Sequence, residues 1–162
     1  MKLSIKKGFS FGLTSGIITT IGLVVGLSSG THSKIVVLAG ILTLAIANSL
    51  SDSYGVHMSE ESGNKKISNK EVWECTISTF LSEIFFSLTF IIPILIFNLD
   101  TAIIMSIIWG LILLSIFSFY IAKQKKENPT KVIIEHLTIS VVVIIITRGA
   151  GTLISNIFGK FL

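Results

Sequence analysis

Residues 8–30 read GFSFGLTSGIITTIGLVVGLSSG and contain six glycines in a stretch that is otherwise apolar and carries no charge. A run of this length can cross the roughly 30 Å hydrocarbon core of a bilayer as one helix. Glycine disfavours helices in water, but in lipid the backbone must satisfy its own hydrogen bonds. The stretch therefore predicts a membrane-spanning helix.

The rest of the chain has the same character. Its 162 residues are 51% hydrophobic and 14% charged, with a mean hydropathy of +0.84, unlike a soluble globular domain. Five runs are long enough to span a membrane, at about 9–29, 35–58, 73–97, 101–122 and 132–156. The segments between them are short, so we expect one all-α domain over residues 1–162, an integral membrane bundle of five transmembrane helices. Pro93 lacks an amide hydrogen and predicts a kink in the third helix.

Lysines mark one side of the membrane. They lie before the first span or in the second and fourth loops, at Lys2, Lys6, Lys7, Lys65, Lys66, Lys70, Lys123, Lys125, Lys126 and Lys131. Lys34 and Lys160 alone fall on the other side. The positive-inside rule then predicts a cytoplasmic N-terminus and an outside C-terminus. We separately expect the membrane to be the cell membrane of a prokaryote. The net charge of +4 is thus a topology signal and does not indicate nucleic-acid binding.

The glycines of the first span share one side of the helix. At about 100° per residue they fall within an arc of about 120°, with hydroxyls inside it and one phenyl ring at its edge. Such a face lets another helix approach closely in lipid. The partner is another span of the same chain, or the first helix of a second copy in a homodimer. In the second case these residues line a seam or an ion path: Gly8, Phe11, Gly12, Ser15, Gly16, Thr19, Gly22, Gly26 and Gly30.

Ionisable residues inside spans are costly and commonly mark ion pathways, proton relays or pairs. Asp52 lies roughly 9 Å inside the second span, and Glu83 roughly 15 Å inside the third. Further candidates gather toward the cytoplasmic side, at His57, Met58, Glu60, Glu61, Glu135 and His136. Oxygen and nitrogen donors suit Fe²⁺, Mn²⁺ or Zn²⁺ better than Cu⁺. The alternative, strongest for Glu60 and Glu61, is that these are ordinary solvated residues at a membrane boundary.

Several stretches resemble the vacuolar iron transporter family of five-span proteins. Residues 8–30 are similar to that family's opening, GLNDGL…S…GLVAG, and residues 47–62, ANSLSDSYGVHMSEES, to its GA.SM..GEY…KS stretch. The run STFLSEIFFSLTFIIPIL, residues 78–95, resembles a family segment that ends in Pro-Leu-Leu-Pro. Residues 126–151 resemble the loop that leads into the family's last span.

The resemblance implies transport of Fe²⁺ or Mn²⁺ out of the cytoplasm, possibly in exchange for protons. Members of the family work as dimers, with the ion path between the two first spans. On this basis the glycine face would lie at the dimer seam. The metal would be a substrate, and no resident cofactor is implied.

The chain also departs from the family pattern. The family's first-span Asp aligns with Phe11 and its Asn with Ser10, while the Met of the second span falls near Ser49. Residues 59–72, SEESGNKKISNKEV, are too short and too rich in lysine for the family's cytoplasmic metal-binding segment. The usual ligands are therefore missing, and Asp52 and Glu83 are the candidates to replace them.

Two classes of function follow. The first is a dimeric divalent-metal transporter that uses Asp52 and Glu83 as ion or proton sites. The second is a protein of the same fold that has lost transport and acts as an interaction or assembly partner. An enzyme is not expected, because the sequence has no HExxH motif and no serine, histidine and aspartate set at one depth.

Overall fold

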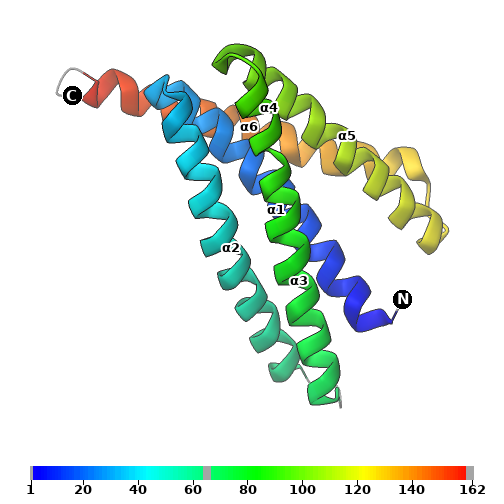
Figure 1. The fold of residues 1–162 in the computed structure, drawn as a ribbon. Coiled ribbons are helices and arrows are strands. Elements are labelled where there is room, and N and C mark those ends of the chain that lie inside the picture. Colours follow the sequence, from blue (N-terminus) through cyan, green and yellow to red (C-terminus); the bar gives the residue numbers. More distant parts are fainter. Residues whose placement is uncertain (1, 64–66, 160–162) are drawn as a thin grey trace. The chain divides into compact units, whose positions relative to one another are not determined.

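The computed structural model describes residues 2–63 and 67–159. Its helices are α1 (Leu3–Thr31), α2 (Lys34–Ser62), α3 (Asn69–Thr89), α4 (Ile91–Ile96), α5 (Leu99–Lys125) and α6 (Pro129–Phe158) (Figure 1). No strand occurs in the described ranges. Three of the lysines used to orient the chain, Lys65, Lys66 and Lys160, lie outside them.

Five helical segments are long and apolar enough to cross a membrane, which confirms the five expected spans. The first two are α1 and α2, the third consists of α3 and α4, and the last two are α5 and α6. Each begins before the apolar run that predicted it, and all but the third also extend past its end. Many large apolar side chains point outward, including Ile46, Phe85 and Ile145 at more than half exposure. This surface is compatible with lipid contact.

The third span is interrupted, as Pro93 predicts. Helix α3 ends at Thr89, Phe90 lies between the helices, and α4 begins at Ile91. The proline ring is incompatible with a straight helix because it crowds the carbonyl four residues earlier, which here belongs to Thr89. The break therefore lies one turn before the proline.

Helix starts are fixed by side-chain caps. At α3, the Ser68 hydroxyl accepts from the Glu71 amide, and the Glu71 carboxylate accepts from the Ser68 amide. This reciprocal pair is a capping box. Asn98 and Asn128 cap α5 and α6 in the same way through their side-chain oxygens.

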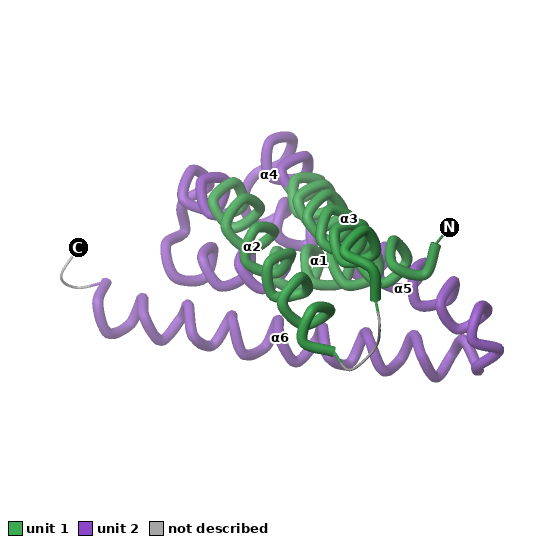
Figure 2. The backbone as a smooth tube through the Cα atoms, turned by 90° about the horizontal axis from the view of Figure 1, so that it is seen from below, with its two compact units in different colours: residues 1–20, 41–90 green, residues 21–40, 91–162 purple. Residues whose placement is uncertain are grey.

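The chain divides into two compact units (Figure 2). Unit 1 comprises Met1–Thr20 and Ile41–Phe90, and unit 2 comprises Ile21–Gly40 and Ile91–Leu162. Unit 1 thus contains the first part of α1, most of α2, and α3. Unit 2 contains the second part of α1, the start of α2, and α4 to α6.

In unit 1, the glycines of α1 pack directly on α3. A Cβ added at Gly8 would overlap the carbonyl oxygen of Cys75, and one at Gly12 would overlap Ser82 and Thr79. At Gly16 the added Cβ would lie 2.8 Å from the Glu83 carbonyl oxygen. Only glycine permits so close an approach of the two backbones.

In unit 2, the remaining glycines of α1 pack on α6. A Cβ at Gly22 would lie 3.0 Å from Val143, one at Gly26 3.3 Å from the Thr147 carbonyl oxygen, and one at Gly30 3.2 Å from the Gly151 carbonyl oxygen. All six glycines are therefore covered within the chain. This is the first of the two expected alternatives, packing on other spans of the same chain, and dimerisation itself stays a prediction.

Candidate functional site

A polar cluster lies inside unit 1, among helices that are otherwise apolar. It joins Ser15 of α1, Asn48 and Asp52 of α2, and Glu83 of α3. Asn48 and Asp52 are four residues apart and share one face of α2. Gly16, next to Ser15, gives the Glu83 backbone room to approach α1. The glycine packing thus brings a carboxylate of α3 to a carboxylate of α2.

Two helices supply hydrogen-bond donors to the carboxyl groups. The Ser15 hydroxyl donates to Asp52 Oδ2 at 2.6 Å and lies 3.3 Å from Glu83 Oε1. The Asn48 amide donates to Glu83 Oε1 at 2.6 Å. A hydroxyl carries one hydrogen, so Ser15 cannot donate fully to both carboxyl groups. The site therefore has more acceptor oxygens than donors.

Glu83 is fully buried, at 0% exposure. Its Oε2 accepts no hydrogen bond from a donor among the described residues, and the neighbouring Asp52 carboxyl group is the one that could share a proton with it. A buried carboxylate oxygen without a partner is unfavourable by several kcal/mol unless it gains a proton donor, water or a cation. This oxygen is the strongest chemical signal in the site.

The cluster lies deep along all three helices. At 1.5 Å per residue, Ser15 is roughly 18 Å from the start of α1, Asp52 roughly 15 Å from the end of α2, and Glu83 roughly 21 Å from the start of α3. Each position is within roughly 6 Å of the middle of its apolar segment, with α3 and α4 taken as one segment. Ionisable groups there usually face a bundle interior or an ion path.

The donor atoms are carboxylate, hydroxyl and amide oxygens, because the Asn48 side chain can also present its oxygen after an amide turn. Such a set suits hard cations and leaves coordination positions for water. Within the described parts of the chain, no three His, Cys, Asp or Glu side chains converge as a metal site. The arrangement is thus a carboxylate pair with polar neighbours, rather than a closed metal cage.

The candidates in the last two turns of α2 contact other residues of unit 1 instead of Asp52 and Glu83. His57 Nε2 lies 3.3 Å from Glu61 Oε1, and His57 Nδ1 lies 3.0 Å from Thr76 Oγ1. Glu60 forms an ion pair with Lys7 at 3.2 Å. Met58 is 47% exposed.

The two candidates on α6 belong to unit 2. His136 Nδ1 lies 2.7 Å from the Ser118 hydroxyl of α5. Glu135 is exposed. Within unit 2, His136 thus contacts a hydroxyl of a neighbouring helix and Glu135 is an exposed charge.

In α1, Phe11 lies one helical turn before Ser15 and Thr19 lies one turn after it. Phe11 is 48% exposed. The Thr19 hydroxyl donates to the Ser15 carbonyl oxygen at 2.7 Å, so its hydrogen bond stays within the helix. Of the two, only Phe11 presents a large side chain at the end of the cluster that faces the N-terminus.

Sequence reasoning missed Asn48. An amide in an apolar span, four residues before a carboxylate, was an available signal, because both side chains must share a face. Ser15 was identified only as part of the glycine face. Its contact with two carboxyl groups depends on helices that are distant in sequence.

Comparisons with protein-family models and with curated proteins found no match to this chain. The functional argument therefore depends on the geometry of the carboxylate pair and its neighbours.

Proposed function

We propose that the protein is a membrane transporter that moves a divalent transition metal, Mn²⁺ or Fe²⁺, out of the cytoplasm. The observation that carries this proposal is the pair formed by the part-buried Asp52 and the fully buried Glu83, whose Oε2 accepts no hydrogen bond from the described residues. A bundle that only needed to pack would gain stability from apolar side chains at these positions. Two carboxyl groups held near mid-membrane depth are suited to bind and release a cation.

The oxygen donors favour Mn²⁺ over Fe²⁺. Carboxylate, carbonyl and water ligands suit Mn²⁺, whereas imidazole and thiolate ligands favour the later metals. The imidazole of His57 contacts Thr76 and Glu61, so it does not add a nitrogen donor to the carboxylate pair. We therefore propose Mn²⁺ as the preferred substrate, partly hydrated in the site.

Proton exchange is a natural part of this proposal. When the ion leaves, Asp52 and Glu83 each lose a positive partner in a region where a bare charge is costly. A proton taken from the outside medium would replace it. The same two carboxyl groups would then alternate between metal and protons.

The entry side is proposed to be the end that carries the N-terminus. Glu60 and Asp52 lie eight residues apart on α2, with Glu60 toward the end of the helix where Lys7 pairs with it. The lysine distribution supports a cytoplasmic N-terminus and an outside C-terminus. The membrane is proposed to be the cell membrane of a prokaryote.

A homodimer through α1 remains part of the proposal, but its contact surface must differ from the glycine face. That face is covered by α3 and α6. Phe11, which is 48% exposed, lies on the part of α1 that stays uncovered in unit 1. A second copy would meet α1 there.

Binding and flux of Mn²⁺ test the proposal together. Proteoliposomes that contain the purified protein should accumulate Mn²⁺ faster than empty liposomes, and an opposing proton gradient should change the rate. In detergent, Mn²⁺ at a hundred times its Kd should stabilise the fold by about 2.7 kcal/mol, measured as a higher melting temperature. If Mn²⁺ and Fe²⁺ produce neither flux nor a melting shift, metal transport is excluded.

The absence of a three-ligand cluster among the described residues favours a second candidate, a transport-inactive protein that serves as an interaction or assembly partner. Phe11 supports the same candidate, because the vacuolar iron transporter family, which the sequence resembles, has a carboxylate at this position. In that case the carboxyl pair would hold protons alone. The same flux and melting measurements separate the two functions.

Phe11→Asp tests whether the phenyl ring limits transport. Phe11 lies one helical turn from Ser15, so a carboxylate there would extend the acidic site toward the N-terminal end. We expect Mn²⁺ flux to rise by about tenfold, since even an outer partner of a metal ligand changes metal affinity by about 10- to 100-fold. Ile46→Asp, at an exposed apolar position of α2, serves as the control and should not raise flux. An unchanged flux in Phe11→Asp would show that this ring does not limit the path.

A further inference from the structure

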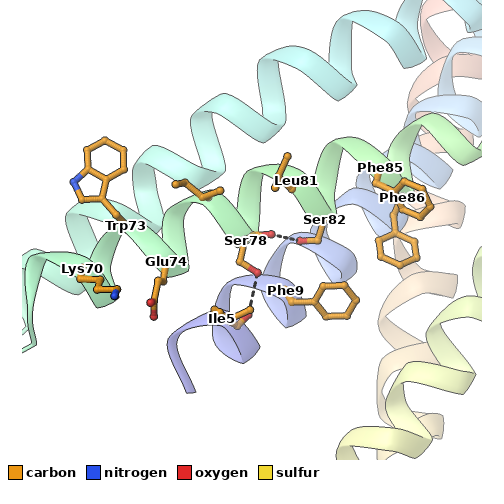
Figure 3. A pocket seen from close by; sticks show the side chains of 11 residues that line it. Ile5, Phe9, Lys70, Trp73, Glu74, Ser78, Leu81, Ser82, Phe85 and Phe86 are labelled. Carbon is orange, nitrogen blue, oxygen red and sulfur yellow. Dashed lines mark hydrogen bonds between the residues drawn. The ribbon is translucent and has the colours of Figure 1, made fainter. Parts of the chain in front are cut away.

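An apolar groove of about 810 Å³ lies between α1 and α3 in unit 1 (Figure 3). Its outer wall is a stripe of α3 side chains at four-residue intervals, each more than half exposed: Trp73, Ile77, Leu81 and Phe85. Ile5 and Phe9 of α1 line the opposite side. Volumes of this order hold organic ligands in other proteins.

The polar atoms within the groove are already used. The Ser78 hydroxyl donates to the Ile5 carbonyl oxygen at 3.0 Å, and the Ser82 hydroxyl donates to the Ser78 carbonyl oxygen at 2.7 Å. Phe9 and Phe86 meet edge to face, with ring centroids 6.0 Å apart. An occupant of this part must therefore be apolar.

The charges lie at one end of the groove, near the start of α3. Glu74 is paired with Lys2 at 2.6 Å and accepts from Ser4 at 2.7 Å, so its charge is compensated. Lys70 is exposed and makes no ion pair among residues 2–63 and 67–159. This end of the groove thus offers the exposed Lys70 ammonium, whose charge also acts on the nearby Glu74.

We propose that this groove binds an anionic phospholipid, with an acyl chain along Ile77, Leu81 and Phe85 and the phosphate at Lys70. The segment from Lys70 to Phe86 is roughly 24 Å long at 1.5 Å per residue, enough for one leaflet of a 30 Å hydrocarbon core. Tryptophan and lysine are the usual residues at the membrane interface. The lipid comes from the leaflet on the N-terminal side. The site is independent of the metal transport proposed above.

Fluorescence quenching of Trp73 tests the site directly. In the Trp109→Phe variant, Trp73 is the remaining tryptophan. The protein is reconstituted in phosphatidylcholine bilayers that contain a minor fraction of lipid with a brominated acyl chain, either phosphatidylglycerol or phosphatidylcholine. We expect brominated phosphatidylglycerol to be enriched about fivefold next to Trp73 relative to brominated phosphatidylcholine.

Lys70→Gln should remove that preference, whereas Lys131→Gln, at an exposed lysine of α6, should retain it. The Trp73→Phe variant reports from Trp109 in α5 and should show equal quenching by both lipids. Equal quenching at Trp73, or a preference that survives Lys70→Gln, would overturn the proposal. Protection of Trp73 from both lipids would also overturn it and would indicate that a second copy covers the groove. None of these readouts requires metal flux, so the two proposals can fail separately.

Discussion

Glu83→Gln is expected to lower Mn²⁺ flux in proteoliposomes by about a hundredfold or more. The change keeps the shape of the side chain and the acceptor for Asn48, but it removes the charge that would hold the ion. Even the loss of an outer partner of a metal ligand lowers affinity by about 10- to 100-fold. Asp52→Asn should have a similar effect, because its carboxylate is joined to Glu83 through Ser15.

Stability distinguishes a transport role from a structural one. A neutral amide costs less free energy to bury than a carboxylate. The Glu83→Gln variant should therefore unfold in detergent at the same temperature as the wild type or higher. Glu127→Gln, at an exposed carboxylate before α6, serves as a matched control with unchanged flux. Wild-type flux in both Glu83→Gln and Asp52→Asn would refute the assignment of the pair. A parallel loss of flux and fold would show that Glu83 is structural.

Gly12→Ala is expected to destabilise the protein by about 3 kcal/mol or more, which is the upper range for overpacking. The added methyl group would overlap the Ser82 side chain and the Thr79 carbonyl oxygen, and the latter belongs to a rigid helix backbone. Helices α1 and α3 would have to separate, which would also part Ser15 from Glu83. Thermal unfolding in detergent measures the loss of stability.

Gly55→Ala is the control for this prediction. Gly55 lies within α2 in the same unit, and a Cβ added there meets no atom within 4 Å. Alanine is the better helix former by about 1 kcal/mol, so this variant should be as stable as the wild type or slightly more so. Similar melting temperatures for Gly12→Ala and the wild type would mean that α1 and α3 do not pack as closely as described.

Hydropathy located the helices but not their ends. The first apolar run was expected at about 9–29, whereas α1 covers Leu3–Thr31. In and just before the additional turn at its start, Lys2 and Ser4 bond to Glu74 of α3. Lys7 in the same region bonds to Glu60 of α2. Such contacts stabilise helix outside the apolar run, and they depend on residues more than fifty positions away.

The sequence also could not identify which helix packs on the glycine face of α1. An arc of small residues predicts close packing, but a span of the same chain and a second copy would use the same kind of surface. In unit 1 the arc meets another small-residue surface on α3, formed by Cys75, Thr79 and Ser82. In unit 2 it meets Thr147 and Gly151 of α6.

The sequence by itself determined that five helices are long and apolar enough to cross a membrane, because length and hydropathy are local properties. It also identified Asp52 and Glu83, because a carboxylate is costly wherever it lies in lipid. Only the tertiary structure decided that Ser15 and Asn48 join them and that Glu83 Oε2 accepts no hydrogen bond from the described residues. These contacts come from the close approach of α1 to α3, which glycine permits and which brings together atoms from three helices.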